Sequence, residues 1–208
     1  MPVAADPQWA RLADAIAGPG HLVEANFASS SEVAALAVAL RARAAAGMFR
    51  DAAVGAGDSR RVRPEIRGDR ISWLDAAETP AEVALFARLE ALRDCLNRSL
   101  MLGLSQLELH YALYPPGRHY VRHLDLSPQG LERVVTVTLY LNEDWIAADG
   151  GELVIAADAG EVAVLPVGGT LVAFLSARFE HEVRSARRER LSLTGWFSRR
   201  RSSGGRLT

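Results

Sequence analysis

The sequence predicts an α+β fold, with helical patterns in the first half of the chain and strand patterns in the second. Three observations predict it. Leucines recur at helical spacing before residue 100, apolar and polar residues alternate after residue 106, and glycine or proline separates the later apolar runs. About eight strands at this spacing are typical of a sandwich or barrel. We therefore expect a β structure supported by helices.

The composition is that of one globular domain over residues 1–208. Hydrophobic residues make up 49% and charged residues 24% of the chain, which allows a sizeable core. The formal net charge of −1 argues against direct nucleic-acid binding. A single cysteine, Cys95, excludes an internal disulfide and suits a reducing compartment. The chain shows no signal peptide and no run of roughly 18 apolar residues, so we expect a cytoplasmic protein without membrane association.

Residues 1–105 are expected to be mainly helical. Asp6-Pro7 and the Ser29–Glu32 and Thr79–Glu82 pairs are start signals for three helices, because such residues cap free backbone N–H groups or fit the first helical turn. The third signal precedes the clearest apolar stripe, which we interpret as core: Leu85, Leu89, Leu92 and Leu96.

Residues 51–67 lie between the second and third predicted helices and contain Gly55, Gly57 and four arginines. Such a segment is either a surface loop or a lid over a site. We favour a substrate lid. Short strands are expected near residues 21–27 and 71–74.

Residues 106–197 are predicted to form a strand-rich catalytic core, followed by a basic tail over residues 198–208. Between residues 135 and 141, Val and Leu alternate with Thr and Tyr, which indicates a strand with one apolar and one polar face. Further short apolar runs predict strands near residues 153–155, 162–165, 171–175, 182–183 and 191–197.

His123 and Asp125 are two residues apart, so on a strand both side chains point to the same side. His181 begins another predicted strand. Two histidines and one carboxylate form the facial triad of non-haem Fe(II) oxygenases, which leaves coordination positions open. The sequence therefore predicts a catalytic Fe(II) site formed by these three residues.

Arg190 follows His181 by nine positions, from 181 to 190. A guanidinium group binds a carboxylate through two parallel hydrogen bonds. If the two strands are neighbours, a dicarboxylate such as 2-oxoglutarate could join the metal to Arg190. The remaining histidines, His21, His110 and His119, have no ligand-like partner by spacing, and we interpret them as ordinary residues.

A larger set of residues agrees in order and spacing with one enzyme family: Arg67-Gly68-Asp69, Trp73, Tyr114-Pro115, Tyr120-Val121-Arg122-His123-Leu124-Asp125, Tyr140-Leu141-Asn142, Trp145, Gly150-Gly151, His181-Glu182-Val183, Arg190, Thr194 and Trp196. Residues 66–197 resemble the prolyl 4-hydroxylase branch of the 2-oxoglutarate oxygenases, the group of the animal oxygen-sensing prolyl hydroxylases and their bacterial relatives. The short turn Tyr114–Gly117 favours the compact bacterial members.

This resemblance implies a double-stranded β-helix with supporting helices packed on one sheet. It implies the cofactors Fe(II), 2-oxoglutarate and O2, with ascorbate as a stimulant. It also implies that four residues bind 2-oxoglutarate: Arg190, Tyr140, Tyr114 and Thr194. For the substrate side it implies Arg67, Asp69, Tyr120, Arg122 and Trp196. Core packing is the alternative for each aromatic residue, and a structural ion pair that shapes the loop is the alternative we favour for Arg67 with Asp69.

The resemblance implies hydroxylation of a prolyl residue at C4 in a protein substrate, with elongation factor Tu as the candidate among bacterial relatives. Two other hypotheses remain open. One is hydroxylation of a free amino acid or small metabolite. The other is a metal-binding sensor without turnover, against which the full set of ligands and Arg190 argues.

Overall fold

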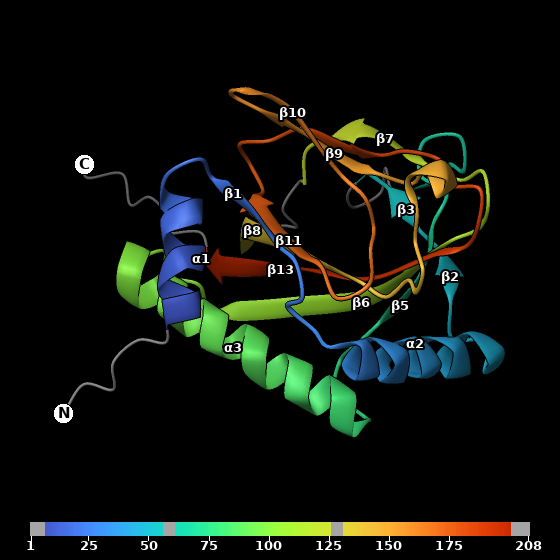
Figure 1. Cartoon of the computed structure of the whole chain (residues 1–208), viewed down its shortest axis with the longest axis horizontal. Helices are drawn as coiled ribbons and strands as arrows, with labels where there is room; N and C mark the ends of the chain where they lie inside the picture. Colours follow the sequence, from blue (N-terminus) through green and yellow to red (C-terminus); the bar gives the residue numbers. More distant parts are fainter. Residues whose placement is uncertain (1–6, 56–60, 126–130, 201–208) are drawn as a thin grey trace, which may run out of the picture.

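The computed structural model describes residues 7–55, 61–125 and 131–200. Two β-sheets face each other, and the helices cover the outer face of the larger sheet (Figure 1). The expected α+β architecture, with two sheets and helices packed on one of them, is confirmed. No helix in these residues is both long and apolar enough to cross a membrane.

The larger sheet is antiparallel throughout and has the order β1-β11-β8-β13-β6-β5-β2. Its strands are β1 (His21–Glu24), β2 (Arg50–Asp51), β5 (Arg70–Trp73), β6 (Gln106–Tyr114), β8 (Leu131–Tyr140), β11 (Leu171–Leu175) and β13 (Arg190–Arg200). The smaller sheet has the order β10-β9-β12-β7. Its strands are β7 (Tyr120–His123), β9 (Leu153–Ala157), β10 (Gly160–Val164) and β12 (His181–Val183).

Three α-helices cover the larger sheet: α1 (Pro7–Ala17), α2 (Ser30–Ala45) and α3 (Pro80–Leu100). The predicted capping boxes are present, because Ser29 and Thr79 each accept a hydrogen bond from a backbone N–H three residues later. A short 3-10 helix, η2 (Ala147–Asp149), precedes β9. The leucine stripe of α3 is buried against the sheet, as predicted.

Alternation along the central strands separates an apolar layer from a polar interior. On β8, Val135, Val137 and Leu139 pack with the helices. Thr136, Thr138 and Tyr140 face the space between the two sheets, where Thr136 and Thr138 line a cavity and Tyr140 packs in the inner core. The predicted two-faced strand therefore places hydroxyl groups inside the protein, where each needs a partner or a ligand.

Two predicted boundaries need correction. β1 ends at Glu24, and Phe27 instead packs its ring against Trp9, with ring centroids 6.4 Å apart. β13 continues through Arg200 into the predicted basic tail, because Arg199 lies opposite Glu132 on β8 and forms two hydrogen bonds of 2.9 Å with its carboxylate. The rest of that tail, residues 201–208, lies outside the described residues.

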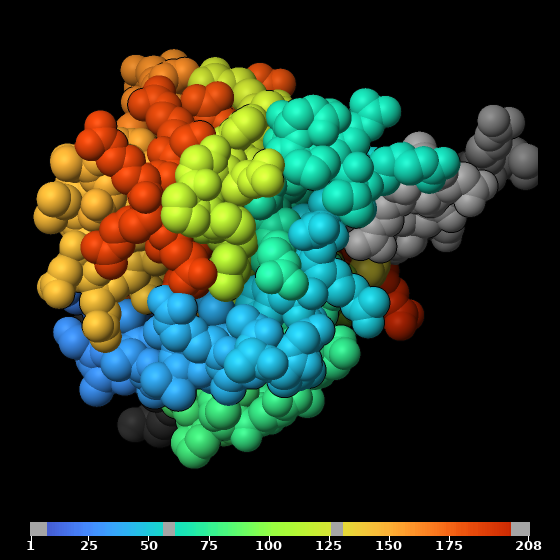
Figure 2. All heavy atoms as spheres, turned by 90° about the vertical axis from the view of Figure 1, so that its right-hand side faces the viewer, coloured from blue at the N-terminus to red at the C-terminus, as the bar shows by residue number. Residues whose placement is uncertain are grey.

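The predicted lid segment contains a small hairpin that the sequence did not reveal. β3 (Ala53–Val54) pairs with β4 (Arg61–Val62), and residues 56–60 between them lie outside the described residues. After the hairpin, the N–H of Gly68 donates to the carbonyl of His119 at 2.9 Å. Figure 2 shows this part of the chain beside the segment that leads into β7, far away in the sequence.

A buried carboxylate ties α3 to the larger sheet. The Glu82 side chain accepts hydrogen bonds of 2.8 Å from the N–H groups of Glu78 and Thr79, and one of 2.9 Å from the Tyr111 hydroxyl on β6. Although burial opposes ionisation, these donors lower the pKa of Glu82 below its usual 4.5. The carboxylate therefore stabilises the fold in its charged form.

We predict that Glu82→Gln lowers the free energy of unfolding by about 2 kcal/mol at neutral pH, because hydrogen bonds to a charged group are lost in a buried site. A carboxyl group whose pKa is lower in the folded than in the unfolded protein stabilises the fold at pH values above its unfolded-state pKa. This stabilisation is lost as pH falls through the folded-state pKa. The two proteins should therefore converge below pH 4.5 in urea denaturation. Glu90→Gln, on the same helix in a half-buried pair with Arg93 and with no buried donor to Glu90 among the described residues, should change stability by less than about 1 kcal/mol.

Candidate functional site

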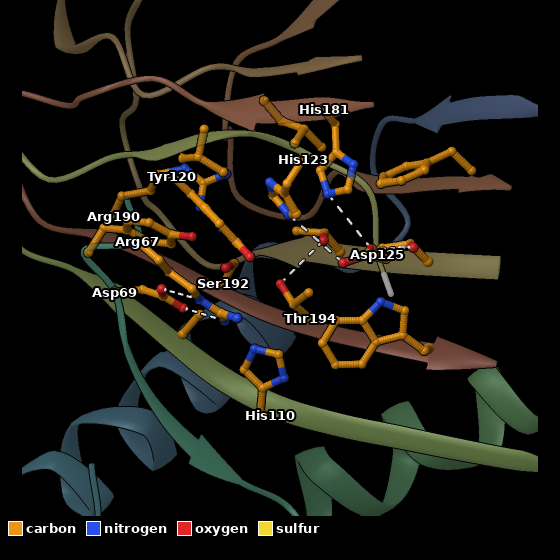
Figure 3. A pocket seen from close by; sticks show the side chains of 18 residues that line it. Arg67, Asp69, His110, Tyr120, His123, Asp125, His181, Arg190, Ser192 and Thr194 are labelled. Atoms are coloured by element: carbon orange, nitrogen blue, oxygen red, sulfur yellow. Dashed lines mark hydrogen bonds and ion pairs between the residues drawn. The ribbon is translucent and has the colours of Figure 1, made fainter. Parts of the chain in front are cut away.

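A cavity between the two sheets contains most of the residues to which the sequence assigns chemistry (Figure 3). The larger sheet contributes alternating residues of β6, β8 and β13, and the smaller sheet contributes β7 and β12. Among the predicted site residues, the following line it: His123, Asp125, His181, Arg190, Tyr114, Thr194, Arg67, Asp69, Tyr120 and Trp196.

His123, Asp125 and His181 converge in this cavity. β7 and β12 pair so that His123 and His181 are direct cross-strand partners, and Asp125 follows β7. Asp125 Oδ1 lies 3.9 Å from His123 Nε2, and Oδ2 lies 3.7 Å from His181 Nε2. One potential ligand atom from each residue lies within 4.8 Å of the others, which is compatible with one shared ion.

The protonation states of these groups suit a metal. Burial, and then the neighbouring His181, lower the pKa of His123 to about 4, so its imidazole is neutral at physiological pH. Burial opposes ionisation of Asp125, but His181 and the Thr136 hydroxyl lower the pKa of that carboxyl group. Neutral imidazole and ionised carboxylate are the forms that bind metal ions.

A β-bulge in β7 decides which of its side chains enter the cavity. The register between β7 and β12 shifts between the His123 and Tyr120 pairs, so these two residues, three apart, both face inward. The Tyr120 ring stacks on His123 at 3.5 Å between centroids. Arg122 points outward and forms ion pairs with Glu161 and Glu182. It lies outside the cavity, so a substrate contact there would have to occur on the outer face of the sheet.

Arg190 lies in the same cavity and is only 2% exposed. Its Nε donates to the carbonyl of Gly151 at 2.9 Å, and its guanidinium carbon lies 5.3 Å and 5.0 Å from the ring centroids of Tyr114 and Tyr140. No carboxylate among the described residues forms an ion pair with it. A buried cation without a counter-charge is costly, so this position fits an anionic ligand.

Gly151, whose carbonyl accepts the hydrogen bond from Arg190, occupies a position that favours glycine. Its φ is +77°, and a Cβ there would lie 2.9 Å from the Cβ of Ala186 and 3.4 Å from Cδ of Arg190. A larger residue would therefore strain the backbone and collide with Ala186 beside the arginine. This accounts for the second glycine of the Gly150-Gly151 pair.

Hydroxyl-bearing residues connect the triad with Arg190. β8 and β13 pair Thr136 with Trp196, Thr138 with Thr194, and Tyr140 with Ser192, in steps of about 6.6 Å along the strands. Thr138 and Thr194 share a hydrogen bond of 3.2 Å. The hydroxyls of Tyr140 and Ser192 are buried without a hydrogen-bonding partner among the described residues. An elongated, oxygen-rich molecule such as 2-oxoglutarate fits this row of donors.

Arg67 and Asp69 form the predicted ion pair inside the cavity wall. Two hydrogen bonds of 2.7 Å and 2.9 Å join them, and Asp69 is 2% exposed. The guanidinium carbon of Arg67 lies 4.8 Å from the Tyr120 ring centroid. Tyr120 is thus held between Arg67 and His123, which makes the pair part of the support for the metal ligands.

His110 is not the ordinary residue that the sequence suggested. It lines the cavity, is 1% exposed, and its Nδ1 has no hydrogen-bonding partner among the described residues. The Trp196 ring stacks on it at 5.3 Å, and burial, with the charge of Arg67, lowers its pKa to about 3. The alternation of β6 places it on the cavity face, but its neighbours come from distant strands and give no local signal.

Comparison with known proteins agrees with this geometry. Residues 109–198 match the 2OG-Fe(II) oxygenase superfamily. A Pseudomonas putida prolyl-4-hydroxylase is 44% identical, with a TM-score of 0.85, over 93% of this chain and 100% of that one. A Trichoplax adhaerens prolyl hydroxylase, solved with a peptide of the hypoxia inducible factor oxygen degradation domain, is 27% identical, with a TM-score of 0.79, over 91% of this chain and 88% of that one.

Rat Egl nine homolog 1 is 30% identical over 64% of this chain and 42% of its own length. The chain spans between 42% and 66% of the length of the mammalian relatives it matches. The solved structures confirm the double-stranded β-helix expected from the sequence. The cluster of potential metal ligands, the buried arginine and the match along the whole Pseudomonas protein agree, and the chain belongs to the 2OG-Fe(II) oxygenase superfamily, as a relative of its prolyl hydroxylases.

Proposed function

We propose that this protein is an Fe(II)- and 2-oxoglutarate-dependent dioxygenase that hydroxylates a prolyl residue of a protein. One observation carries the proposal. A single cavity holds both the cluster of His123, Asp125 and His181 and a buried Arg190 without a carboxylate partner among the described residues. These are a potential metal site and a potential anion site in one cavity, which one elongated co-substrate could occupy together.

Iron and 2-oxoglutarate, when bound, supply the activation of O2 that no side chain of the protein can perform. The reaction as a whole balances as follows: one oxygen atom of O2 enters a C–H bond of the substrate, the other enters succinate, and CO2 leaves 2-oxoglutarate. The protein contributes ligands, orientation and a site from which bulk water is excluded.

The far carboxylate of 2-oxoglutarate would bind Arg190, with hydroxyl donors beside it. Burial raises the pKa of Tyr140 to about 12 despite the nearby guanidinium, so its hydroxyl stays protonated and can donate. Ser192 offers a second hydroxyl, and Thr194 lines the path toward the metal. Tyr114 packs on Arg190 and orients it.

The cavity wall around Trp196 supports a peptide substrate over a free amino acid. Trp196 and His110 both line the cavity, so a prolyl ring that enters it would contact their stacked aromatic side chains. Both arginines at this wall already face a carboxylate: Arg67 binds Asp69, and Arg133 lies 3.8 Å from Glu108. The free carboxylate of an amino acid would have to compete for these cations, whereas a peptide carbonyl would not.

We further propose that the substrate is a polypeptide, and we name a candidate target protein. The Trichoplax relative binds a peptide fragment of a protein, which supports a polypeptide substrate here. The hairpin of β3 and β4 is the part of the predicted lid that could contact such a chain, and the segment after it is hydrogen-bonded to the start of β7 through Ile66 and Gly68. Elongation factor Tu is the first candidate to test.

His123→Ala should abolish conversion of 2-oxoglutarate to succinate and weaken Mn(II) binding, because one of three ligands is lost. Succinate formation and calorimetric titration with Mn(II) measure the two effects. His119→Ala, near the same strand but outside the triad, should retain both. Normal succinate formation by His123→Ala would show that the metal lies elsewhere, and no turnover by the wild type would favour a metal-binding sensor.

Arg190→Met keeps most of the side-chain volume but removes the charge. The KM for 2-oxoglutarate should rise at least about tenfold, because a charge-assisted pair contributes about 1.5–3 kcal/mol. Steady-state succinate kinetics measure this. Arg188→Met is the matched control, since Arg188 is exposed and donates to the carbonyls of Glu143 and Asp144. An unchanged KM in Arg190→Met would exclude the carboxylate site.

Elongation factor Tu incubated with the enzyme, Fe(II), 2-oxoglutarate and ascorbate should gain the mass of one oxygen atom on a proline, as read by tandem mass spectrometry. Free proline in a parallel reaction should remain unchanged. The His123→Ala protein serves as the blank. Hydroxylation of free proline but of no prolyl peptide, in this protein or in a proline-containing peptide library, would contradict the proposed substrate class.

A further inference from the structure

Each of the three metal-binding side chains has a hydrogen-bonding group behind it. His123 Nδ1 lies 2.8 Å from the carbonyl oxygen of Val121, and His181 Nδ1 lies 3.3 Å from that of Phe179. A carbonyl oxygen only accepts, so Nδ1 carries the proton in both rings and Nε2 keeps a lone pair for the metal. The two histidines are therefore oriented by the backbone.

Asp125 differs, because side chains orient it. The Thr136 hydroxyl on β8 donates to Asp125 Oδ2 at 2.7 Å, and the Ser176 hydroxyl lies 2.8 Å from Thr136 Oγ1. Thr136 is 2% exposed and Ser176 is fully buried. Ser176 directly follows β11 and is anchored by its own N–H, which donates to the carbonyl of Val134 at 3.0 Å.

The direction of these hydrogen bonds follows from the carboxylate of Asp125, at which they end. An ionised carboxylate can only accept hydrogen bonds, so the proton of the Thr136 hydroxyl is directed at Asp125. With its only proton used, Thr136 must accept from Ser176. Both hydroxyls thus point the same way, and in a low-dielectric interior each bond strengthens the next. The result is a one-way relay from Ser176 through Thr136 to Asp125.

We propose that Thr136 and Ser176 are positioning residues that hold Asp125 in its metal-binding orientation and set the affinity of the site for a divalent cation. The inference rests on the metal site of the proposed function. Partners behind metal ligands fix ligand orientation and charge, and their loss typically weakens metal binding by about 10- to 100-fold. Since backbone carbonyls orient both histidine rings by hydrogen bonding, this relay is a part of the hydrogen-bonded support that side-chain substitution can alter.

The relay also predicts which substitution weakens metal binding more. Thr136 touches the ligand, whereas Ser176 acts only through Thr136. Thr136→Val, which keeps the side-chain shape, should weaken Mn(II) binding about tenfold. Ser176→Ala should weaken it about threefold, the effect of one neutral hydrogen bond. In the Thr136→Val background, Ser176→Ala should have no further effect, because the group through which it acts is gone.

The experiment is Mn(II) titration of the whole protein under anaerobic conditions, with free Mn(II) followed by electron paramagnetic resonance. Thr136→Ser retains the hydroxyl and should restore binding. Thr170→Val makes the same change at a buried position outside the cavity and should bind Mn(II) like the wild type. Thermal unfolding of each variant separates lost folding from lost affinity.

The proposal would be overturned if the Thr136→Val protein bound Mn(II) as tightly as the wild type. It would also be overturned if Ser176→Ala weakened Mn(II) binding equally in the wild-type and Thr136→Val backgrounds. A wild type that binds no Mn(II) would overturn both the relay and the metal site. If the variants show the predicted order while the wild type forms no succinate from 2-oxoglutarate, the relay stands and the proposed enzymatic activity fails.

Discussion

The antiparallel pairing of β8 with β13 fixes which residues face the cavity and which face the helices. Because side chains alternate along a strand, a slip of one residue would turn the hydroxyl-bearing row of each strand toward the helices and the leucines toward the cavity. On its other side β13 pairs with β6, and Gly195 in the middle of β13 permits that pairing. A Cβ at that position would collide with the backbone oxygen of Glu108 on β6, so glycine alone permits the close approach of the two strands.

This pairing places polar groups in the interior, where burial is unfavourable unless each group is satisfied. At one end of the cavity, carbonyl and hydroxyl groups hydrogen-bond to His123, Asp125 and His181. At the other end, Arg190 retains an uncompensated charge, and the hydroxyls beside it lack partners among the described residues. Oriented metal ligands at one end of the cavity and buried polar groups without partners at the other suit a bound anion that also reaches the metal.

The sequence predicted the elements and residues whose signals are local. The cluster of His123, Asp125 and His181 could be predicted from residue types and spacing, although β7 ends at His123 and Asp125 lies just after it. The capping boxes could be predicted because residues three positions apart define them. Alternation with His123 places Arg122 on the outer face, but the inward position of Tyr120 could not be predicted, because it depends on the bulge in β7. His110, Thr136 and Ser176 were missed as functional residues because their partners come from other strands. Ion pairing of Arg199 with Glu132 likewise carried β13 past its predicted end.

The central claim is that one molecule of 2-oxoglutarate bridges Arg190 and a single metal ion held by His123, Asp125 and His181. A crystal structure of the protein with Mn(II) and 2-oxoglutarate, grown without O2, tests it most directly. The account predicts an anomalous peak bonded to His123, Asp125 and His181, and a 2-oxoglutarate carboxylate within hydrogen-bonding distance of Arg190. A metal bound elsewhere, or a co-substrate whose carboxylates leave Arg190 unpaired, would contradict it.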